Sequence, residues 1–348
     1  MHAPRPVATA PLAVTRYGPW LLLVFAIASL FLLRGYHLLL ATNITAFAIA
    51  ILGLNLLSGY NGQISLGHGA FLALGGYATA ILMARFGVPF WLAVPLAGLV
   101  SMGLGLLIAI PALRLEMLYL ALATFSLAIA VPQLAKNKLV SAWTGGVQGL
   151  EVPKPAPWTA LGFDADQTVY AYALVVAAIC FAAVLNLLRG RMGRALEAIR
   201  DQPLAADTMG VDTRFVKTAC FGLSAFLTGL AGGLGAVASH FVSPDGYTFF
   251  LSITLLVGAV IGGFRSVWGA LFGGAFIVLM PNYAEELAKG APWVVYGLAT
   301  IVFMAVMPNG FAGLFNSVTA RIANAVSGWS RSPARTSTRA APHVRPNP

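Results

Sequence analysis

GYHLLLATNITAFAIAILGLNLLSGYNGQISLGHGAFLALGGYATAILMA, residues 35–84, is a run of 50 residues without Lys, Arg, Asp or Glu. As a single α-helix it would be about 75 Å long, because each residue adds about 1.5 Å. The hydrocarbon core of a bilayer is only about 30 Å thick, and about 20 apolar residues cross it. The run must therefore turn back at least once, and the turn-forming residues SGYNG at 58–62 predict where it does so.

The composition of the whole chain also indicates a protein that spans a membrane. Of its 348 residues 59% are apolar and 9% are charged, whereas soluble domains carry about 25% charged residues. Cys180 and Cys220 both lie in apolar runs, and their spacing indicates neither a disulfide framework nor a zinc site. The net charge of +10 accompanies no basic-aromatic module of the kind that binds nucleic acid. The chain is therefore predicted to be a membrane protein with no nucleic-acid partner.

Further runs without Lys, Arg, Asp or Glu are long enough to cross a bilayer. Together with the two halves of 35–84 they predict an all-α polytopic membrane protein of about ten transmembrane helices, with a broken or re-entrant segment near 58–68. We expect the first run to be an uncleaved span, so that the transmembrane domain covers residues 17–318. The other runs are 17–33, 86–113, 117–135, 167–188, 218–244, 246–264, 266–284 and 290–320.

The distribution of basic residues predicts which loops face the cytoplasm. When residues 189–217 are placed inside and the spans alternate, 15 Lys and Arg lie inside and 6 outside, as the positive-inside rule requires. Both termini are then cytoplasmic, including the N-terminal segment 1–16. Residues 136–166 form a periplasmic loop that is long enough to contact another protein. The basic tail 319–348, rich in Ser and Pro, is predicted to be disordered and to lie near anionic lipid.

No motif indicates that the chain performs chemistry itself. It lacks GxxxxGK[ST], HExxH and GxSxG. Ion-driven carriers commonly keep an ionisable group at membrane depth. Every Asp and Glu of this chain lies near or outside a predicted membrane boundary, so His68 is the clear candidate for such a group. We therefore expect no catalytic residue, metal site or cofactor in this chain. A secondary carrier and a membrane-embedded enzyme remain as alternatives.

Polar residues gather where the long run turns back, alternating with glycines in SGYNGQISLGHGAFLALGGY at 58–77. Non-helical backbone at membrane depth is tolerated only inside protein or beside a water-filled cavity. One interpretation is a broken helix beside a substrate pathway. The other is close packing of small residues, with the hydroxyls bonded to the preceding helical turn. The candidate pathway residues are Asn61, Gln63, Ser65, His68, Thr124 and Ser126.

RGRMGRALEAIRDQPLAADTMGVDTRFVK, residues 189–217, is the most densely charged part of the chain and holds six of its 21 Lys and Arg. Residues 193–201 predict a short helix with one apolar side. Pro203 and Gly210 suit the first turn and the end of a second short helix. We expect this second helix to present small side chains that can enter a cleft of a cytoplasmic protein, namely those of Ala205 and Ala206. The alternative is a solvated loop whose arginines only set the topology.

Seven stretches between about residues 40 and 315 follow the motif order of a known family. They are GYNGQISLGHGAF (59–71), LRLEMLYLALATFS (113–126), TGGVQGL (144–150), GRALEAIRDQPLAADTMGV (193–211), FVSPDGYTFFLSI (241–253), VIGGFRSVWGALFGGAF (260–276) and MPNGFAGLF (307–315). On these stretches the sequence resembles the permease subunit of LIV-type branched-chain amino acid ABC importers. Of the two paralogous permeases of such importers it resembles the M-type.

The resemblance implies a transport permease of the bacterial inner membrane and a set of partners. These are a paralogous second permease, two ATPase subunits that bind ATP and Mg, and a periplasmic substrate-binding protein. In ABC importers the permease loop that meets the ATPase has the pattern EAA, three residues, then Gly, which residues 204–210 match with Leu in place of Glu. The implied ATPase-coupling residues are Arg194, Glu197, Arg200, Leu204, Ala205, Ala206 and Gly210.

Two positions depart from the family pattern. The Ile-x-Leu-Pro that usually follows the coupling loop is absent at 218–221, and Arg265 occupies a position that is usually Gly. The implied substrate is a branched-chain or similarly apolar amino acid. Similar permeases serve urea, short amides or aromatic acids, and these alternatives stay open because the binding protein largely sets the specificity of such importers.

Overall fold

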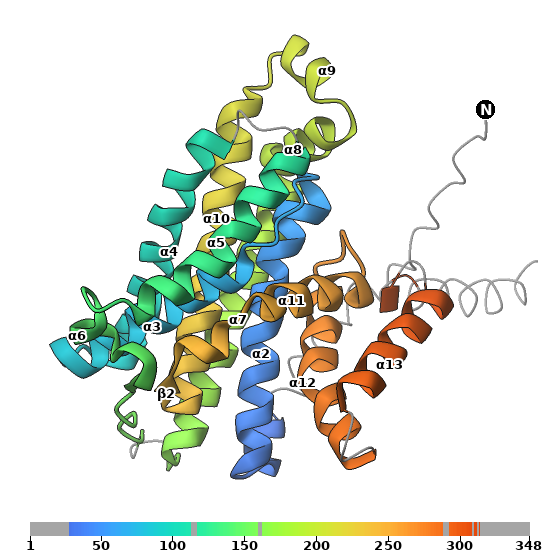
Figure 1. Cartoon of the computed structure of the whole chain (residues 1–348). Coiled ribbons are helices and arrows are strands. Elements are labelled where there is room, and N and C mark those ends of the chain that lie inside the picture. The colour runs from blue at the N-terminus through green and yellow to red at the C-terminus, as the bar shows by residue number, and fades with distance from the viewer. Residues whose placement is uncertain are drawn as a thin grey trace, which may run out of the picture.

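The computed structural model describes residues 28–112, 117–158, 162–287 and 292–307, together with residues 310, 311 and 313. Within these ranges the chain is mainly helical (Figure 1), as expected for an all-α polytopic membrane protein. The predicted N-terminal segment 1–16, most of the first predicted span and the tail 319–348 lie outside the described residues.

Nine long or medium helices form the body of the molecule in the described ranges. They are α2 (Tyr36–Leu54), which continues as the π-helical turns η1 (Asn55–Tyr60), α3 (His68–Phe86), α4 (Phe90–Ala112), α5 (Met117–Lys136), α7 (Ala165–Arg189), α10 (Thr213–Ser239), α11 (Phe249–Gly262), α12 (Gly269–Leu287) and α13 (Pro292–Val306). Short elements lie between them. They are α6 (Ser141–Thr144), η2 (Gly146–Gln148), β1 (Leu150–Glu151), α8 (Arg191–Asp201), α9 (Pro203–Thr208), β2 (Phe241–Val242) and η4 (Pro244–Tyr247).

Six described helices are long and apolar enough to cross a membrane, namely α2 with η1, α3, α4, α5, α7 and α10. The predicted spans 246–264 and 290–320 contain shorter helices. The 14 residues of α11 extend over about 21 Å at about 1.5 Å per residue, less than the roughly 30 Å of hydrocarbon. This helix is shorter than its apolar run because the run also includes the turn η4 and the loop that follows Gly262.

The short elements gather at two opposite ends of the molecule. Helices α8 and α9 lie at one end, at the top of Figure 1, and α6 and β2 lie at the other. At the second end β1 pairs with β2, with Leu150 opposite Val242. The Lys136 ammonium lies 2.6 Å from the Asp245 carboxylate at this end. Residues 189–217 and 136–166 therefore lie at opposite ends, which we call the coupling end and the outer end.

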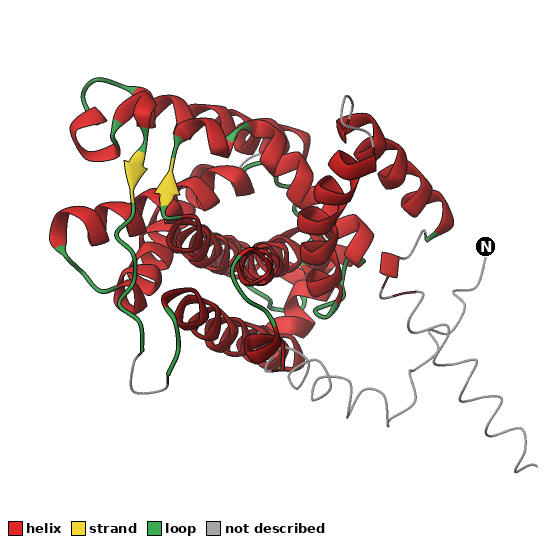
Figure 2. Ribbon diagram, turned by 90° about the horizontal axis from the view of Figure 1, so that it is seen from below, coloured by secondary structure: helices red, strands yellow, loops and turns green. Residues whose placement is uncertain are grey.

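The core is built around α10, which packs against α2, α3 and α4. Seen from the outer end, several long helices stand side by side in the body of the molecule (Figure 2). Glycines permit the closest approach, because a Cβ at Gly75 of α3 would overlap the carbonyl of Gly229 on α10. A Cβ at Gly232 would likewise overlap the carbonyl of Leu72. Such small-residue contacts let two helix backbones touch and are typical of membrane proteins.

The predicted break in the first long run is present. The helix that begins at Tyr36 continues to Tyr60, and residues 61–67 are not helical before α3 begins at His68. His68 is only 1% exposed, so α3 begins inside the protein rather than at its surface. A second non-helical segment, 263–268, separates α11 from α12. Both α3 and α12 run from such a segment towards the outer end (Figure 1).

Candidate functional site

The break between η1 and α3 is held by hydrogen bonds between neighbouring polar groups. The Ser58 hydroxyl donates to the carbonyl of Gln63 at 2.9 Å, and Asn61 Nδ2 donates to Gln63 Oε1 at 2.8 Å. Asn61 and Ser65 are buried, with 3% and 1% of their surfaces exposed. The predicted pathway residues of 61–68 therefore form one polar segment, in which Asn61, Ser65 and His68 are buried and Gln63 is partly exposed, and their side chains determine the shape of the turn.

His68 belongs to an unbroken chain of hydrogen bonds across three helices. Its Nε2 lies 2.8 Å from Ser224 Oγ of α10, and that hydroxyl donates to the carbonyl of Gly53 on α2 at 2.7 Å. Because Ser224 uses its only proton for Gly53, it accepts from His68, and Nε2 therefore carries the ring proton. Nδ1 accepts from Ser65 Oγ at 3.1 Å. The imidazole is thus fully satisfied inside the protein and joins α3 to α2 and α10.

The structure separates the two candidate hydroxyls of α5. Thr124 is fully buried, and its Oγ1 accepts from the backbone N–H of Leu66 at 3.0 Å, inside the break. Ser126 is exposed and donates to the carbonyl of Leu122, one helical turn earlier, at 3.0 Å. Thr124 therefore belongs with residues 61–68, whereas Ser126 points away from them.

Two residues that the sequence did not single out complete the polar segment. They are Ser224 of α10 and Ser252 of α11, whose Oγ accepts from the backbone N–H of Gly69 at 2.9 Å. Each is a serine within a long apolar run, and most such hydroxyls bond to their own helix. Their partners lie 156 and 183 positions away in the sequence, so no local pattern could have identified them.

At the coupling end, α8 lies on the body of the protein as an amphipathic helix. Leu196 and Ile199 are each 1% exposed and pack into the core, while Arg194 and Glu197 are exposed. The helix begins two residues earlier than predicted, at Arg191, and ends at Asp201 as predicted. The apolar side of α8 therefore holds the helix on the body of the protein, and its charged side remains exposed.

Helix α9 presents large apolar side chains to solvent. Leu204 is 79% exposed and Met209 is 85% exposed. Ala205 is exposed as expected, but Ala206 is only 4% exposed and packs in the same core cluster as Leu196. The expectation that Ala206 is presented to a partner is therefore wrong, because a helix lying on a protein surface turns one side inward and Ala206 is on that side. Met209 was not predicted.

The ends of α9 follow the predicted chemistry. Pro203 is at its start, where the missing N–H costs no hydrogen bond. Gly210 has φ +82° and follows the last turn, a conformation that glycine adopts without strain. Asp212 then accepts from the backbone N–H of Phe215 at 3.0 Å and so caps α10. The chain therefore leaves α9 sharply and enters the central helix directly.

Arg200 connects α8 to the first non-helical segment. Its Nη1 lies 3.5 Å from the carbonyl of Gly59, and its side-chain stem lies against Gly62, where a Cβ would come within 2.7 Å of Arg200 Cγ. Its Nη2 also pairs with Asp201 at 2.7 Å. The start of the non-helical segment 61–67 therefore packs against the Arg200 side chain of α8.

Glu197 connects α8 to the second non-helical segment. Its Oε1 lies 3.7 Å from Arg265 Nη2. The carbonyl of Arg265 accepts from the Tyr60 hydroxyl at 2.5 Å, and Asn55 Nδ2 donates to the carbonyl of Ser266 at 3.2 Å. Thus α8, the π-helical end η1 and the loop 263–268 form one connected group at the coupling end.

Comparison with known proteins identifies the family. A family model described as "Branched-chain amino acid transport system / permease component" matches residues 36–307. The chain belongs to this permease family. The match covers every described long helix from α2 to α13, including the polar break and helices α8 and α9.

Individual relatives are permease proteins of the same kind. The permease is 31% identical over 312 residues to the high-affinity branched-chain amino acid transport system permease protein LivM of Salmonella typhimurium, covering 83% of this chain and 73% of LivM. LivM of Escherichia coli gives the same identity and coverage. The probable branched-chain amino acid transport permease protein LivH of Methanocaldococcus jannaschii is 26% identical over 262 residues, covering 71% and 82%. No solved structure matches the permease.

These relatives confirm the resemblance to M-type permeases. The permease is a multi-pass membrane protein and a component of a transporter rather than an enzyme.

Proposed function

We propose that the permease is one membrane subunit of an ATP-binding-cassette importer that moves branched-chain or similarly apolar amino acids across the bacterial inner membrane. Its partners would be a paralogous permease, two ATPase subunits that bind ATP and Mg, and a periplasmic binding protein. The observation that carries this proposal is the match of the family model over residues 36–307. The exposed apolar tip of α9 between charged residues supports it, because it suits insertion into a cleft of a cytoplasmic protein.

In this proposal helices α8 and α9 receive the motion of the ATPase. Arg200 and Glu197 of α8 contact the two non-helical segments that precede α3 and α12. Non-helical segments can change conformation without breaking a complete helix, whereas packed helices move as rigid bodies. A displacement of α8 would therefore tilt α3 and α12 together. Both termini and the coupling end would face the cytoplasm, and the outer end would face the binding protein.

Purification and reconstitution test the proposal. The permease is expressed with a second permease and ATPase subunits from the same organism, and the complex is placed in liposomes with the binding protein. We expect leucine uptake that requires both ATP and the binding protein. Uptake of leucine by the permease alone, driven by an ion gradient without ATP, would contradict the proposal. ATP-dependent uptake of urea or benzoate instead of leucine would support the ATP-driven mechanism but show that the proposed substrate is wrong.

Substitutions at Arg265 test the link between α8 and the second segment. Arg265 has φ +69°, where a residue other than glycine loses about 1 kcal/mol. Both partners of its ion pair are half exposed, so the pair adds less than about 1 kcal/mol to stability. We expect Arg265→Gly to raise thermal stability and Arg265→Ala not to. Both should lower ATP-driven uptake by roughly 2- to 30-fold, the usual range for residues that carry coupling.

The charge reversal provides the control for Arg265. The double variant Glu197→Arg with Arg265→Glu restores an ion pair and should recover part of the uptake lost by Glu197→Arg alone. If Arg265→Gly is more stable and transports as well as the unchanged complex, the side chain has no part in coupling.

A further inference from the structure

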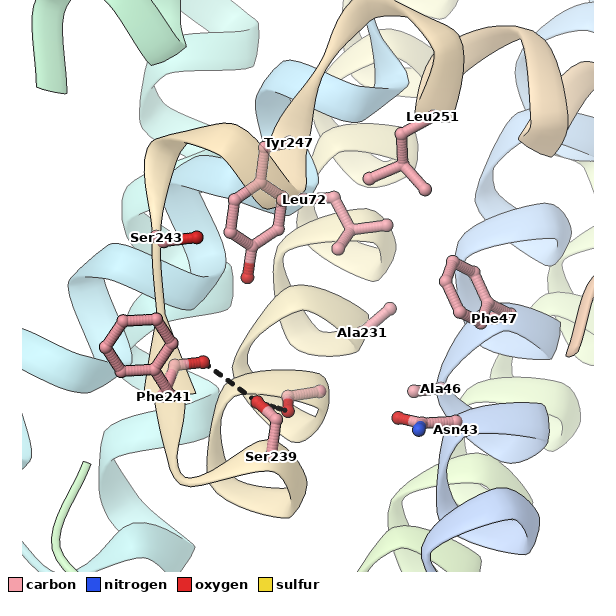
Figure 3. A pocket seen from close by; sticks show the side chains of 12 residues that line it. Asn43, Ala46, Phe47, Leu72, Ala231, Ser239, Phe241, Ser243, Tyr247 and Leu251 are labelled. Carbon is pink, nitrogen blue, oxygen red and sulfur yellow. Dashed lines mark hydrogen bonds between the residues drawn. The ribbon is translucent and has the colours of Figure 1, made fainter. Parts of the chain in front are cut away.

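A cavity opens between helices near the outer end. It has a volume of about 230 Å³ and is bounded by α2, α3, α10 and the segment from β2 to α11. Figure 3 shows Asn43 and Phe47 of α2 on one wall and Ser239 of α10 and Phe241 on the other. Drug-sized ligands occupy roughly 300–1,000 Å³. The cavity is therefore suited to a smaller solute.

The cavity has apolar walls and a few polar groups. Asn43 has no hydrogen-bond partner within the described part of the chain, although its amide offers both a donor and an acceptor. Ser243 and Tyr247 add two hydroxyl groups from the segment that leads to α11. Ser239 is the last residue of α10, where the carbonyl end of the helix carries partial negative charge and favours a cation.

The charge of the lining restricts the class of solute. None of the described residues around the cavity is Lys, Arg, Asp or Glu. A solute with net charge would lose its hydration here without an opposite charge, which costs several kcal/mol. A purely polar solute such as urea would gain no apolar contact from the remaining lining. That apolar lining includes Ala46, Phe47, Leu72 and Leu251. The lining therefore suits a small solute without net charge that has both polar ends and an apolar side chain.

We infer that this cavity is a binding site for the transported solute, and that it accepts a zwitterionic amino acid with an apolar side chain. This inference rests on the proposed function and assigns a position to its substrate. The Asn43 amide and the hydroxyls of Ser243 and Tyr247 bind the amino acid's polar groups. The side chain lies against Phe47 and Leu251.

The cavity lies directly above the buried polar segment. Leu72 is one helical turn beyond His68 on α3, and Ala231 is two turns beyond Ser224 on α10, so each pair shares a helix face. Leu72 and Ala231 form the inner boundary of the cavity, and the hydrogen-bonded chain of His68 closes the protein behind them. The hydrogen bonds of His68 thus lie between the cavity and the coupling end, and they block the passage of a solute in that direction.

Gly235 allows the cavity to be filled without disturbing the fold. It lines the cavity, and a Cβ added there meets no heavy atom within 4 Å. Gly103 of α4 provides the matched control, because a Cβ there also meets nothing within 4 Å, and Gly103 is exposed and does not line the cavity. Both positions are helical, so replacing glycine should not destabilise either helix.

The first experiment measures uptake by the reconstituted complex for Gly235→Ala, Gly235→Val and Gly103→Val. One added methylene in an apolar pocket changes discrimination by roughly 10- to 200-fold. We expect Gly235→Val to lower leucine uptake at least about 10-fold, and Gly235→Ala to reduce leucine uptake more than alanine uptake. Gly103→Val should transport both normally. Equal leucine uptake by Gly235→Val and the unchanged complex would overturn the inference.

The second experiment does not depend on transport. Gly246→Cys is labelled from the outer side with a membrane-impermeant maleimide, because Gly246 lines the cavity, is exposed and offers no side-chain group to the solute. The buried Cys180 and Cys220 serve as unreactive background. Leucine should slow the labelling of the complex and urea should not. Labelling that leucine leaves unchanged would overturn the inference. An unchanged complex that imports no leucine with ATP would instead refute the proposed function, so the two failures can be told apart.

Discussion

Complexes that carry Leu204→Asp are expected to lose their ATPase subunits during purification and to lose ATP-driven uptake. Leu204 is 79% exposed at the tip of α9, so in the free permease the substitution costs little. In a docked complex the carboxylate would be buried without a partner. Loss of such a central contact costs about 2–4 kcal/mol, or roughly 30- to 1,000-fold in affinity. The measurement is co-purification of the ATPase, followed by uptake in liposomes.

Leu139→Asp is the matched control for this variant. Leu139 is 89% exposed at the outer end, so the same change of side chain there should leave the ATPase bound. Ala205→Asp should behave like Leu204→Asp, since Ala205 is also exposed on α9. Ala206→Asp is uninformative about docking, because it places a carboxylate in the core. Normal ATPase recovery with both Leu204→Asp and Ala205→Asp would show that α9 is not the docking helix.

Gly75→Leu is expected to prevent folding of the permease. A Cβ at Gly75 already overlaps the carbonyl of Gly229, so any side chain must force α3 away from the central helix α10. Overpacking a core by a few methylenes costs about 1–3 kcal/mol, and displacing two backbones that touch costs more. We expect little monodisperse protein after extraction in detergent, and a lowered midpoint of thermal unfolding even for Gly75→Ala.

Gly103→Leu supplies the comparison for Gly75→Leu. It introduces the same side chain into a transmembrane helix at a position with open space around it. Its yield and unfolding midpoint should match those of the unchanged permease. If Gly75→Leu folds equally well, then α3 and α10 are not packed through this glycine, and the arrangement of the core around α10 is incorrect.

Much of the architecture could be predicted from local patterns. A run of 50 residues without Lys, Arg, Asp or Glu is too long to cross a bilayer once, so its length required a turn, and the turn-forming residues at 58–62 indicated the position. The loops 136–166 and 189–217 lie at opposite ends, in agreement with the alternation of basic residues. Pro203 and Gly210 lie at the ends of α9 because their own backbone preferences suit those positions. Each of these predictions depends on neighbouring residues or on composition.

Other features depend on contacts between distant parts of the chain. Ala205 and Ala206 are identical and adjacent, yet one is exposed and the other buried, because only the position of α9 on the body decides which side faces inward. Thr124 and Ser126 are likewise similar hydroxyl residues two positions apart on α5, and only the packing of that helix buries the first and exposes the second. Nothing near Arg265 in the sequence indicates that its partners are Tyr60 and Glu197, which come from other helices.

The polytopic all-α architecture and the position of the break followed from hydropathy and turn residues, because these act locally. The hydrogen bonds of His68, the partners of Arg265 and the cavity beside Asn43 arise only when α2, α3, α10 and α11 pack together. The physical reason is that a buried polar group or an open space is defined by all the elements around it. Those elements are far apart along the chain and meet only in the folded protein.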